Sequence, residues 1–301
     1  MTLPVVRVAG TEFVTEDGQY FPYVGVSDFA LFKRWLMPNG SWALVEPRLA
    51  EWRAIAHAGG YDGPIVLRVF RYAHPDNAFG IGDPWSYDFT QLTELTEFVG
   101  ERGFYIDWTT GDSQWIIPDQ NGPRGQQQHL NMTCAALAGT TNAFVETSNE
   151  SFKNGQLAEH GVVPPVWGQY LRDSGAYGES SNWPVGTNLD FISYHGSRSD
   201  KGMAPWPFWI GEMWASALVL NTTHGKPAVM KEPIGFAEVA VPGRRSNNPQ
   251  HAFRMGLVGS VCAGVTFHSQ DGRDGDGLRP VQRACAEAFF AGIKAAISDH
   301  I

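Results

Sequence analysis

The feature that most constrains the fold of this chain is an alternation of short apolar, β-branched runs with longer amphipathic stretches. This alternation is typical of βαβ units, in which parallel strands are connected by helices. Seven strands are predicted, over 23–26, 64–70, 104–109, 143–147, 190–195, 228–232 and 264–268. Helices are predicted over about 41–58, 89–102, 127–139, 208–220, 249–262 and 281–297. A further strand, between Tyr177 and Pro184, is inferred from the count alone.

The length of the chain and its number of strands favour a (β/α)8 barrel, or TIM barrel, made by residues 1–301 as a single domain. Such a barrel needs roughly 250 residues. Residues 5–18 predict a short β-hairpin with an Asp17-Gly18 turn, and we expect this hairpin to cap the bottom of the barrel. The alternative, an open doubly wound sheet, would want a glycine-rich phosphate loop after its first strand, and none occurs in the sequence.

Charge and hydropathy exclude several classes of partner. With a net charge of −9 and no basic stripe, the chain is not expected to bind nucleic acid. No apolar run approaches the roughly 20 residues that span a bilayer, so no membrane partner is expected. The segment 1–4 lacks the basic and apolar regions of a signal peptide. The compartment stays open, with a cytoplasmic location as the default and secretion or association with a particle as alternatives. Nothing in the sequence specifies an oligomeric state.

Two glutamates stand at the ends of predicted strands, where (β/α)8 barrels build their active sites. Glu150 follows the run 143–147, and Glu232 ends the run 228–232. Singly, such a carboxylate is either functional or paired with a cation. Together the two suit hydrolysis of a glycosidic bond, in which one carboxylic acid protonates the leaving oxygen while a carboxylate roughly 5 Å away attacks the anomeric carbon. The attacking carboxylate must stay ionised, and Arg68, in the second strand, is the candidate cation.

Two segments carry a resemblance to a known clan. Residues 146–150, Glu-Thr-Ser-Asn-Glu, resemble the Asn-Glu at the end of the fourth strand in the clan A glycoside hydrolases, which are retaining glycosidases built on (β/α)8 barrels. The resemblance implies that Glu150 is the acid/base and that Asn149 binds the sugar 2-hydroxyl. Residues 226–233, Lys-Pro-Ala-Val-Met-Lys-Glu-Pro, resemble the seventh strand of that clan, which implies that Glu232 is the nucleophile.

The resemblance also implies residues that position the sugar. Arg68 falls where the clan has an arginine that supports the nucleophile, and 190–195 resembles its sixth strand, whose His or Tyr lies close to the nucleophile. Tyr194 and His195 are adjacent, so a regular strand points them to opposite faces, and we favour His195 at the site. Trp108 and His268, on the third and eighth predicted strands, complete the predicted substrate-binding set.

The function implied is a retaining glycosidase that cleaves β-linked oligo- or polysaccharide by double displacement. Its partner is a carbohydrate, and no cofactor is implied. The sequence contains eleven tryptophans, several of which stand beside Gly, Pro or Asn in predicted loops. These are equally consistent with packing under loops and with platforms that stack on sugar rings. The motifs specify neither the sugar nor the linkage, nor whether cleavage is internal or terminal.

Departures from the clan leave a second function open. The eighth strand ends at His268 where the clan often has a Trp under the sugar, and Ser151 follows the Asn-Glu where many members have Pro. A carbohydrate-binding or structural barrel that has lost turnover would fit these departures. A third reading, a metal-dependent barrel hydrolase, would use acids such as Asp107, Asp112 and Glu146. It would also want a His-x-His on the first strand, and 23–28 offers none.

The loop Asp271–Asp276 has the acidic and glycine content of a calcium-binding loop. It lacks the glutamate at the twelfth position of an EF-hand, where Gln282 stands. We interpret it as a glycine-rich loop beside the active site. No metal site is predicted, because the cysteines and histidines show no zinc-binding spacing.

Overall fold

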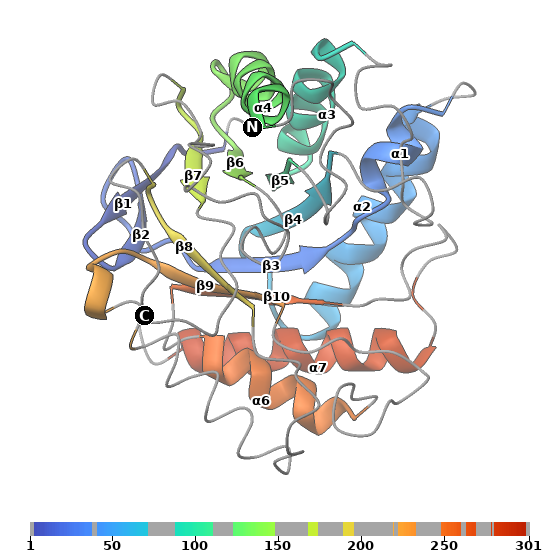
Figure 1. Ribbon diagram of the computed structural model, residues 1–301. Coiled ribbons are helices and arrows are strands. Elements are labelled where there is room, and N and C mark those ends of the chain that lie inside the picture. Colours follow the sequence, from blue (N-terminus) through green and yellow to red (C-terminus); the bar gives the residue numbers. More distant parts are fainter. Residues whose placement is uncertain are drawn as a thin grey trace.

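The computed structural model shows eight parallel strands in one curled sheet, with helices outside it (Figure 1). The strands are β3 (Tyr23–Ser27), β4 (Ile65–Phe70), β5 (Phe104–Thr109), β6 (Ala143–Glu146), β7 (Leu171–Asp173), β8 (Ile192–His195), β9 (Ala228–Glu232) and β10 (Gly264–Phe267). The structure describes residues 3–37, 41–71, 88–110, 123–147, 168–173, 189–195, 219, 222–232, 248–259, 263–268, 278 and 280–298.

The order of the strands is that of a barrel. In the sheet they run β7-β6-β5-β4-β3-β10-β9-β8, so chain neighbours are also spatial neighbours and β10 returns to β3. The edge strands β7 and β8 meet, because the N–H groups of Asp190 and Phe191 donate to the carbonyl oxygen of Arg172 at 2.8 and 3.2 Å. The Arg172 guanidinium also pairs with the Asp190 carboxylate at 2.5 Å. The predicted (β/α)8 barrel is therefore confirmed.

The fifth barrel strand lies earlier in the chain than predicted. It is β7, Leu171–Asp173, whereas the sequence placed it between Tyr177 and Pro184. The strand has three residues, of which only Leu171 is apolar, so it lacks an apolar run long enough to predict a strand. Its polar residue Arg172 is used instead to join β7 to β8.

The helices follow the predicted ranges closely where the structure describes them. They are α1 (Leu31–Trp35), α2 (Ser41–Ala58), α3 (Thr90–Glu101), α4 (Pro123–Leu137), α6 (Pro249–Gly259) and α7 (Pro280–Ile297). The short helix α1 was not predicted. The helix predicted over 208–220 lies outside the described residues, apart from Val219. Among the described helices, none combines the length and the apolar character needed to cross a membrane.

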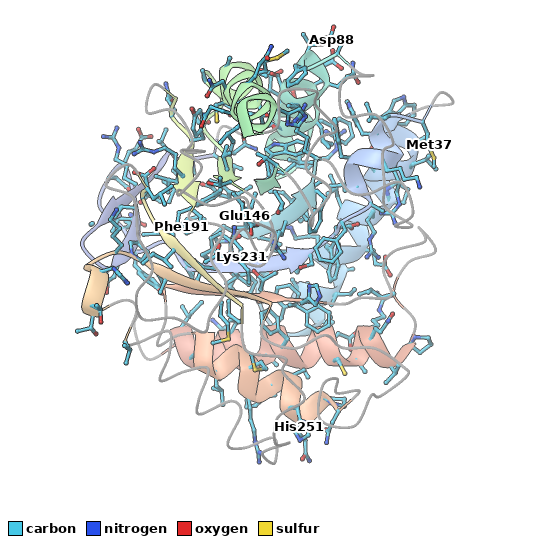
Figure 2. The ribbon with its side chains drawn as sticks, in the orientation of Figure 1. Met37, Asp88, Glu146, Phe191, Lys231 and His251 are labelled. Carbon is cyan, nitrogen blue, oxygen red and sulfur yellow. The ribbon has the colours of Figure 1, made fainter. Side chains whose placement is uncertain are left out.

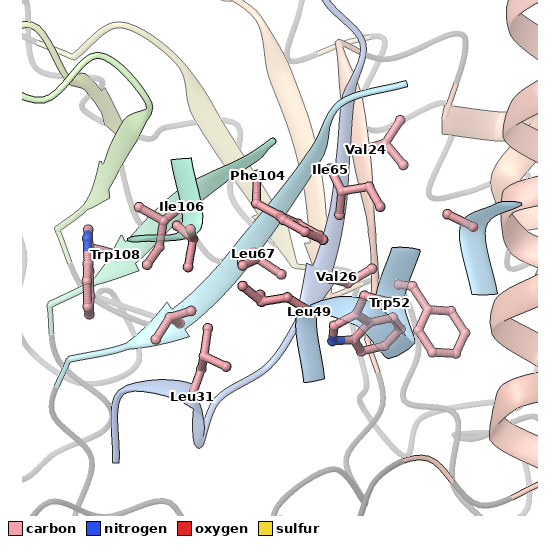
Figure 3. Packing of buried hydrophobic residues seen from close by; sticks show 14 of the residues in the cluster. Val24, Val26, Leu31, Leu49, Trp52, Ile65, Leu67, Phe104, Ile106 and Trp108 are labelled. Atoms are coloured by element: carbon pink, nitrogen blue, oxygen red, sulfur yellow. The ribbon is translucent and has the colours of Figure 1, made fainter. Parts of the chain in front are cut away.

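Alternation along the strands separates an outer core from an inner one. On β4, Ile65, Leu67 and Val69 belong to the cluster that packs against the helices, while Val66 belongs to a second cluster inside the barrel. On β5, Phe104, Ile106 and Trp108 likewise face outward, and Tyr105 faces inward. Figure 3 shows the outer cluster, which includes Trp52 and Leu49 of α2. This period of two is what a sheet buried on both faces requires.

The N-terminal hairpin closes the bottom of the barrel. Its strands β1 (Val6–Ala9) and β2 (Glu12–Thr15) pair antiparallel. Phe13 is fully buried, with its ring 6.0 Å from Tyr23, 6.0 Å from Phe144 and 5.3 Å from Phe191. Tyr23 begins β3, and Phe144 lies near the start of β6, so these rings fill the barrel at the N-terminal ends of its strands. The expected cap is therefore present.

A buried ion cluster attaches α1 and α2 to the first barrel strand. Asp28, directly after β3, accepts bonds from Arg34 at 3.0 Å, Arg48 at 2.7 Å and the Trp52 indole at 3.0 Å. Burial alone would raise the pKa of Asp28, but Arg48 and Arg34 outweigh it and hold this pKa below its usual range. These contacts account for the carboxylate at this strand end as a structural group.

We expect Asp28→Asn to lower the free energy of unfolding by about 3 kcal/mol at pH 7, because Arg34 and Arg48 lose their buried counter-charge. The lowered pKa means that this contribution is fully present above the unfolded pKa of about 4 and is lost as the pH falls through the folded value. Urea unfolding between pH 7 and 3 measures the difference, which should shrink toward acid. Asp62→Asn is the control, since the Asp62 side chain is 73% exposed. A difference that stays constant with pH would contradict the role assigned to Asp28.

Candidate active site

A layer of charged side chains lies inside the barrel, directly above the apolar bottom. On β4, β5, β6 and β9 the residue two positions after an inward apolar residue is charged: Arg68 after Val66, Asp107 after Tyr105, Glu146 after Phe144 and Lys231 after Val229. All four charged side chains are fully buried. Figure 2 shows Glu146 and Lys231 near the centre of the molecule, with Phe191 close by.

The four charges form one bonded network. Arg68 holds Glu146 through two bonds, Nε to Oε2 at 2.9 Å and Nη2 to Oε1 at 3.1 Å. Lys231 Nζ lies 2.5 Å from Asp107 Oδ2 and 3.3 Å from Glu146 Oε2. Two hydroxyl groups also bond these carboxylates: Tyr23 donates to Asp107 at 2.5 Å and Thr109 donates to Glu146 at 2.7 Å. Two cations thus face two carboxylates, and the layer is formally neutral, as burial of charge requires.

This layer brings β6 and β9 together across the barrel. Those strands are not neighbours in the sheet, yet the Lys231 ammonium reaches Glu146 directly. Each strand leads to one of the two predicted catalytic glutamates. Glu232 is the last residue of β9, and Glu150 lies four positions beyond Glu146, which ends β6. Because parallel strands of a barrel end at the same rim, the chain leaves both strands toward one mouth.

The predicted catalytic and sugar-binding residues fall partly outside what the structure describes. Asn149 and Glu150 lie outside the described residues, as does the Asp271–Asp276 loop. Glu232, Tyr194 and His195 are described as backbone only, in β9 and β8. Within that backbone, His195 is the registered partner of Glu232, so the chain positions of the two lie side by side at the rim.

A β-bulge separates Lys231 from the regular pairing of β8 and β9. Tyr194 pairs with Met230, and the next residue, His195, pairs with Glu232, so Lys231 has no counterpart on β8. A bulge of this kind adds one residue to one strand and re-aims the residues after it. Lys231 is therefore the extra residue of β9 at this point of the sheet.

His268 and Trp108, both predicted to bind substrate, occupy different sides of the sheet. His268 directly follows β10 and is buried, with Nδ1 3.2 Å from the Ser27 hydroxyl and its ring 5.1 Å from Phe29. Trp108 lies on the outer face, where its indole donates to Thr96 of α3 at 3.0 Å. Its fully buried ring packs between the sheet and the helices, away from the barrel interior. Trp108 is therefore not part of the site that we propose.

Sequence reasoning missed Lys231 and the ion pair between Arg68 and Glu146. Arg68 was predicted to support the nucleophile, and the structure pairs its guanidinium with Glu146 of β6, two strands away in the sheet. The signal for Lys231 was a lysine inside the apolar run 228–232, at the inward position two residues after Val229. Within the described ranges, no three His, Cys, Asp or Glu side chains gather as a metal site.

No protein-family model matches the sequence, and no curated protein is similar enough to match it. Solved structures are similar in fold. A glycoside hydrolase family 5 mannosidase from Rhizomucor miehei in complex with mannosyl-fructose is 12% identical, with a TM-score of 0.62 and 98% of each chain covered. A β-glucanase from Saccharophagus degradans is 11% identical, with a TM-score of 0.61, over 98% of this chain and 95% of that one.

A glycoside hydrolase family 5 structure from Bacteroides vulgatus is 12% identical, with a TM-score of 0.56, and covers 90% of this chain. The chain spans 63% of the length of that protein and 61% of a further structure from the same organism. At these identities the likeness establishes the fold. The barrel of this chain is thus the barrel on which these glycoside hydrolases are built.

Proposed function

We propose that this chain is a retaining glycoside hydrolase that cleaves β-linked oligo- or polysaccharide. The observation that carries the proposal is the contact of Lys231 with Glu146 across the barrel, at 3.3 Å. It ties together the two strands that lead to Glu150 and Glu232, and a pair of carboxyl groups on opposite sides of a glycosidic bond is what the reaction needs. The mannosidase and β-glucanase that share the fold make β-mannosides and β-glucans the substrates to test first.

In the proposed mechanism the carboxylate of Glu232 attacks the anomeric carbon while the bond from that carbon to the leaving oxygen breaks. Glu150 gives its proton to this oxygen. In the second step Glu150 takes a proton from water, the water oxygen bonds to the anomeric carbon, and the ester to Glu232 breaks. Each step inverts the anomeric centre once, so the released sugar keeps its configuration.

The remaining predicted residues would hold the sugar and the nucleophile. Asn149 would bind the 2-hydroxyl, and His195, whose backbone is paired with Glu232, would lie beside the nucleophile together with Tyr194. His268 would border the same mouth at the end of β10. Arg68 would act from the barrel interior, through the ion pair that fixes Glu146 at the end of β6.

The test follows hydrolysis of β-1,4-linked manno- and gluco-oligosaccharides by proton NMR, which resolves the anomer released first. We expect the β-anomer to appear first, with its α form following by mutarotation. Addition of a chelator should leave the rate unchanged. Release of the α-anomer first would refute double displacement. Binding of the oligosaccharides without cleavage by the wild-type chain would favour the carbohydrate-binding barrel instead.

A further inference from the structure

Lys231 is a buried lysine to which the proposed catalytic steps assign no role. Its ammonium is fully buried, bonded to carboxylates of β5 and β6, and 5.3 Å from the centre of the Phe191 ring. Of its two carboxylate partners, Asp107 has few other bonds. Asp107 uses Oδ2 for both Lys231 and Tyr23, while its Oδ1 has no hydrogen-bond partner within the described part of the chain.

The backbone at Lys231 is a point where the regular pairing of the sheet is interrupted. Lys231 is the extra residue of β9 between the pairs Tyr194–Met230 and His195–Glu232, so the register of the two strands shifts at this residue. On its other side, β9 pairs with β10 in the register Val229–Gly264 and Met230–Val265. Pairing resumes at Glu232 with His195. A bulge re-aims the residues that follow it, so a restraint on Lys231 also affects the geometry of Glu232.

The side chain of Lys231 supplies such a restraint. It crosses the barrel and ends on two carboxylates that are themselves fixed, Asp107 by Tyr23 and Glu146 by Arg68 and Thr109. A charge buried among bonded partners has one favourable position, because any displacement leaves carboxylates unpaired in a medium of low polarity. The restraint acts on the residue that immediately precedes Glu232.

We infer that Lys231 is a positioning residue for Glu232: its ion pairs with Asp107 and Glu146 hold the bulge of β9, and thereby the backbone from which the nucleophile projects. This inference rests on the proposed role of Glu232. A catalytic group displaced by about 1 Å can lose about 100-fold in rate, so the restraint should be visible in kcat.

The first variant is Lys231→Met, which keeps the length of the side chain and removes its charge. We expect kcat to fall about 100-fold and KM to stay within about threefold. Lys226→Met is the matched control. Lys226 lies two residues before β9, at the opposite end of the strand, and its ammonium donates to the Leu189 carbonyl oxygen. Its kcat should stay within about threefold of the wild type.

A second variant separates positioning from charge balance. In Lys231→Met/Asp107→Asn one cation and one carboxylate are removed together, so Arg68 and Glu146 remain balanced. We expect the urea midpoint to return toward that of the wild type while kcat stays low. If kcat recovers along with the midpoint, Lys231 only balances charge and the inference is wrong.

Hydrogen exchange of the backbone tests the inference without any substrate. In both variants the amides of 228–232 should exchange about tenfold faster than in the wild type, while those of 264–267 in β10 serve as the internal reference. Unchanged exchange in β9 would overturn the inference even if the enzyme is active. If the wild type hydrolyses no glycoside but β9 loosens as expected, the proposed function fails and Lys231 still holds the bulge.

Discussion

Glu232→Ala is expected to lower kcat by about 10⁴-fold or more, which corresponds to about 5.5 kcal/mol of lost transition-state stabilisation. The loss should be this large because the nucleophile forms the covalent bond to the anomeric carbon in the first step. Initial rates with an activated aryl β-glycoside measure it. The loss is read from kcat and not from KM, because removal of the nucleophile slows the chemical step.

Comparison with Glu150→Ala distinguishes loss of the nucleophile from loss of the acid/base. An activated aryl leaving group needs little protonation, so the first step should survive in that variant while the second step becomes slow. Azide should then restore turnover of Glu150→Ala and give a β-glycosyl azide. Glu101→Ala, which alters an exposed carboxylate at the end of α3, is the control and should match the wild type. Retention of more than about a tenth of wild-type kcat by Glu232→Ala would contradict the assignment.

Arg68→Met is expected to lower the free energy of unfolding by about 3–5 kcal/mol. The substitution preserves most of the volume and removes the guanidinium that holds both oxygens of Glu146 in a fully buried site. Lys231 alone would then face two carboxylates. Urea denaturation followed by circular dichroism gives the change.

Two further variants show whether the buried charge is the cause. Arg102→Met removes a guanidinium that pairs with the exposed Glu46 and Glu101, and it should cost less than about 1 kcal/mol. Arg68→Met/Glu146→Gln removes both charges of the buried pair, so it should recover much of the stability lost by Arg68→Met. If the double variant loses as much free energy of unfolding as the two single variants together, the ion pair is not the cause of the loss in Arg68→Met.

Much of the barrel could be predicted from the sequence because its strands are buried on both faces. Runs such as Ile65–Phe70 and Phe104–Thr109 are long and mostly apolar or aromatic, with charges only at inward positions. The strand Leu171–Asp173 could not be predicted, because a three-residue strand with two polar members has no periodic signal. Its place is set by tertiary contacts, namely pairing with β6 and closure onto β8.

The residues of the charged layer are visible in the sequence, but local patterns do not show that they face the barrel interior and bond to one another. Trp108 and Asp107 are neighbours in one strand, and only the period of two decides that Asp107 faces the interior while Trp108 faces the helices. Lys231 resembles an ordinary lysine at a strand end. Its importance depends on Asp107 and Glu146, which are more than eighty residues away in the chain and meet it only once the barrel has closed.

The central claim, that Glu232 is the nucleophile of a retaining glycosidase, is tested most directly by trapping the covalent intermediate. The wild type, Glu232→Ala and Glu150→Ala would be incubated with activated 2-fluoro β-mannoside and β-glucoside and analysed by intact mass and peptide mapping. We predict one added 2-fluoroglycosyl group on the wild-type chain, located on Glu232, and none on Glu232→Ala. An adduct on any other residue, or no adduct from a preparation that binds the oligosaccharides, would contradict the claim.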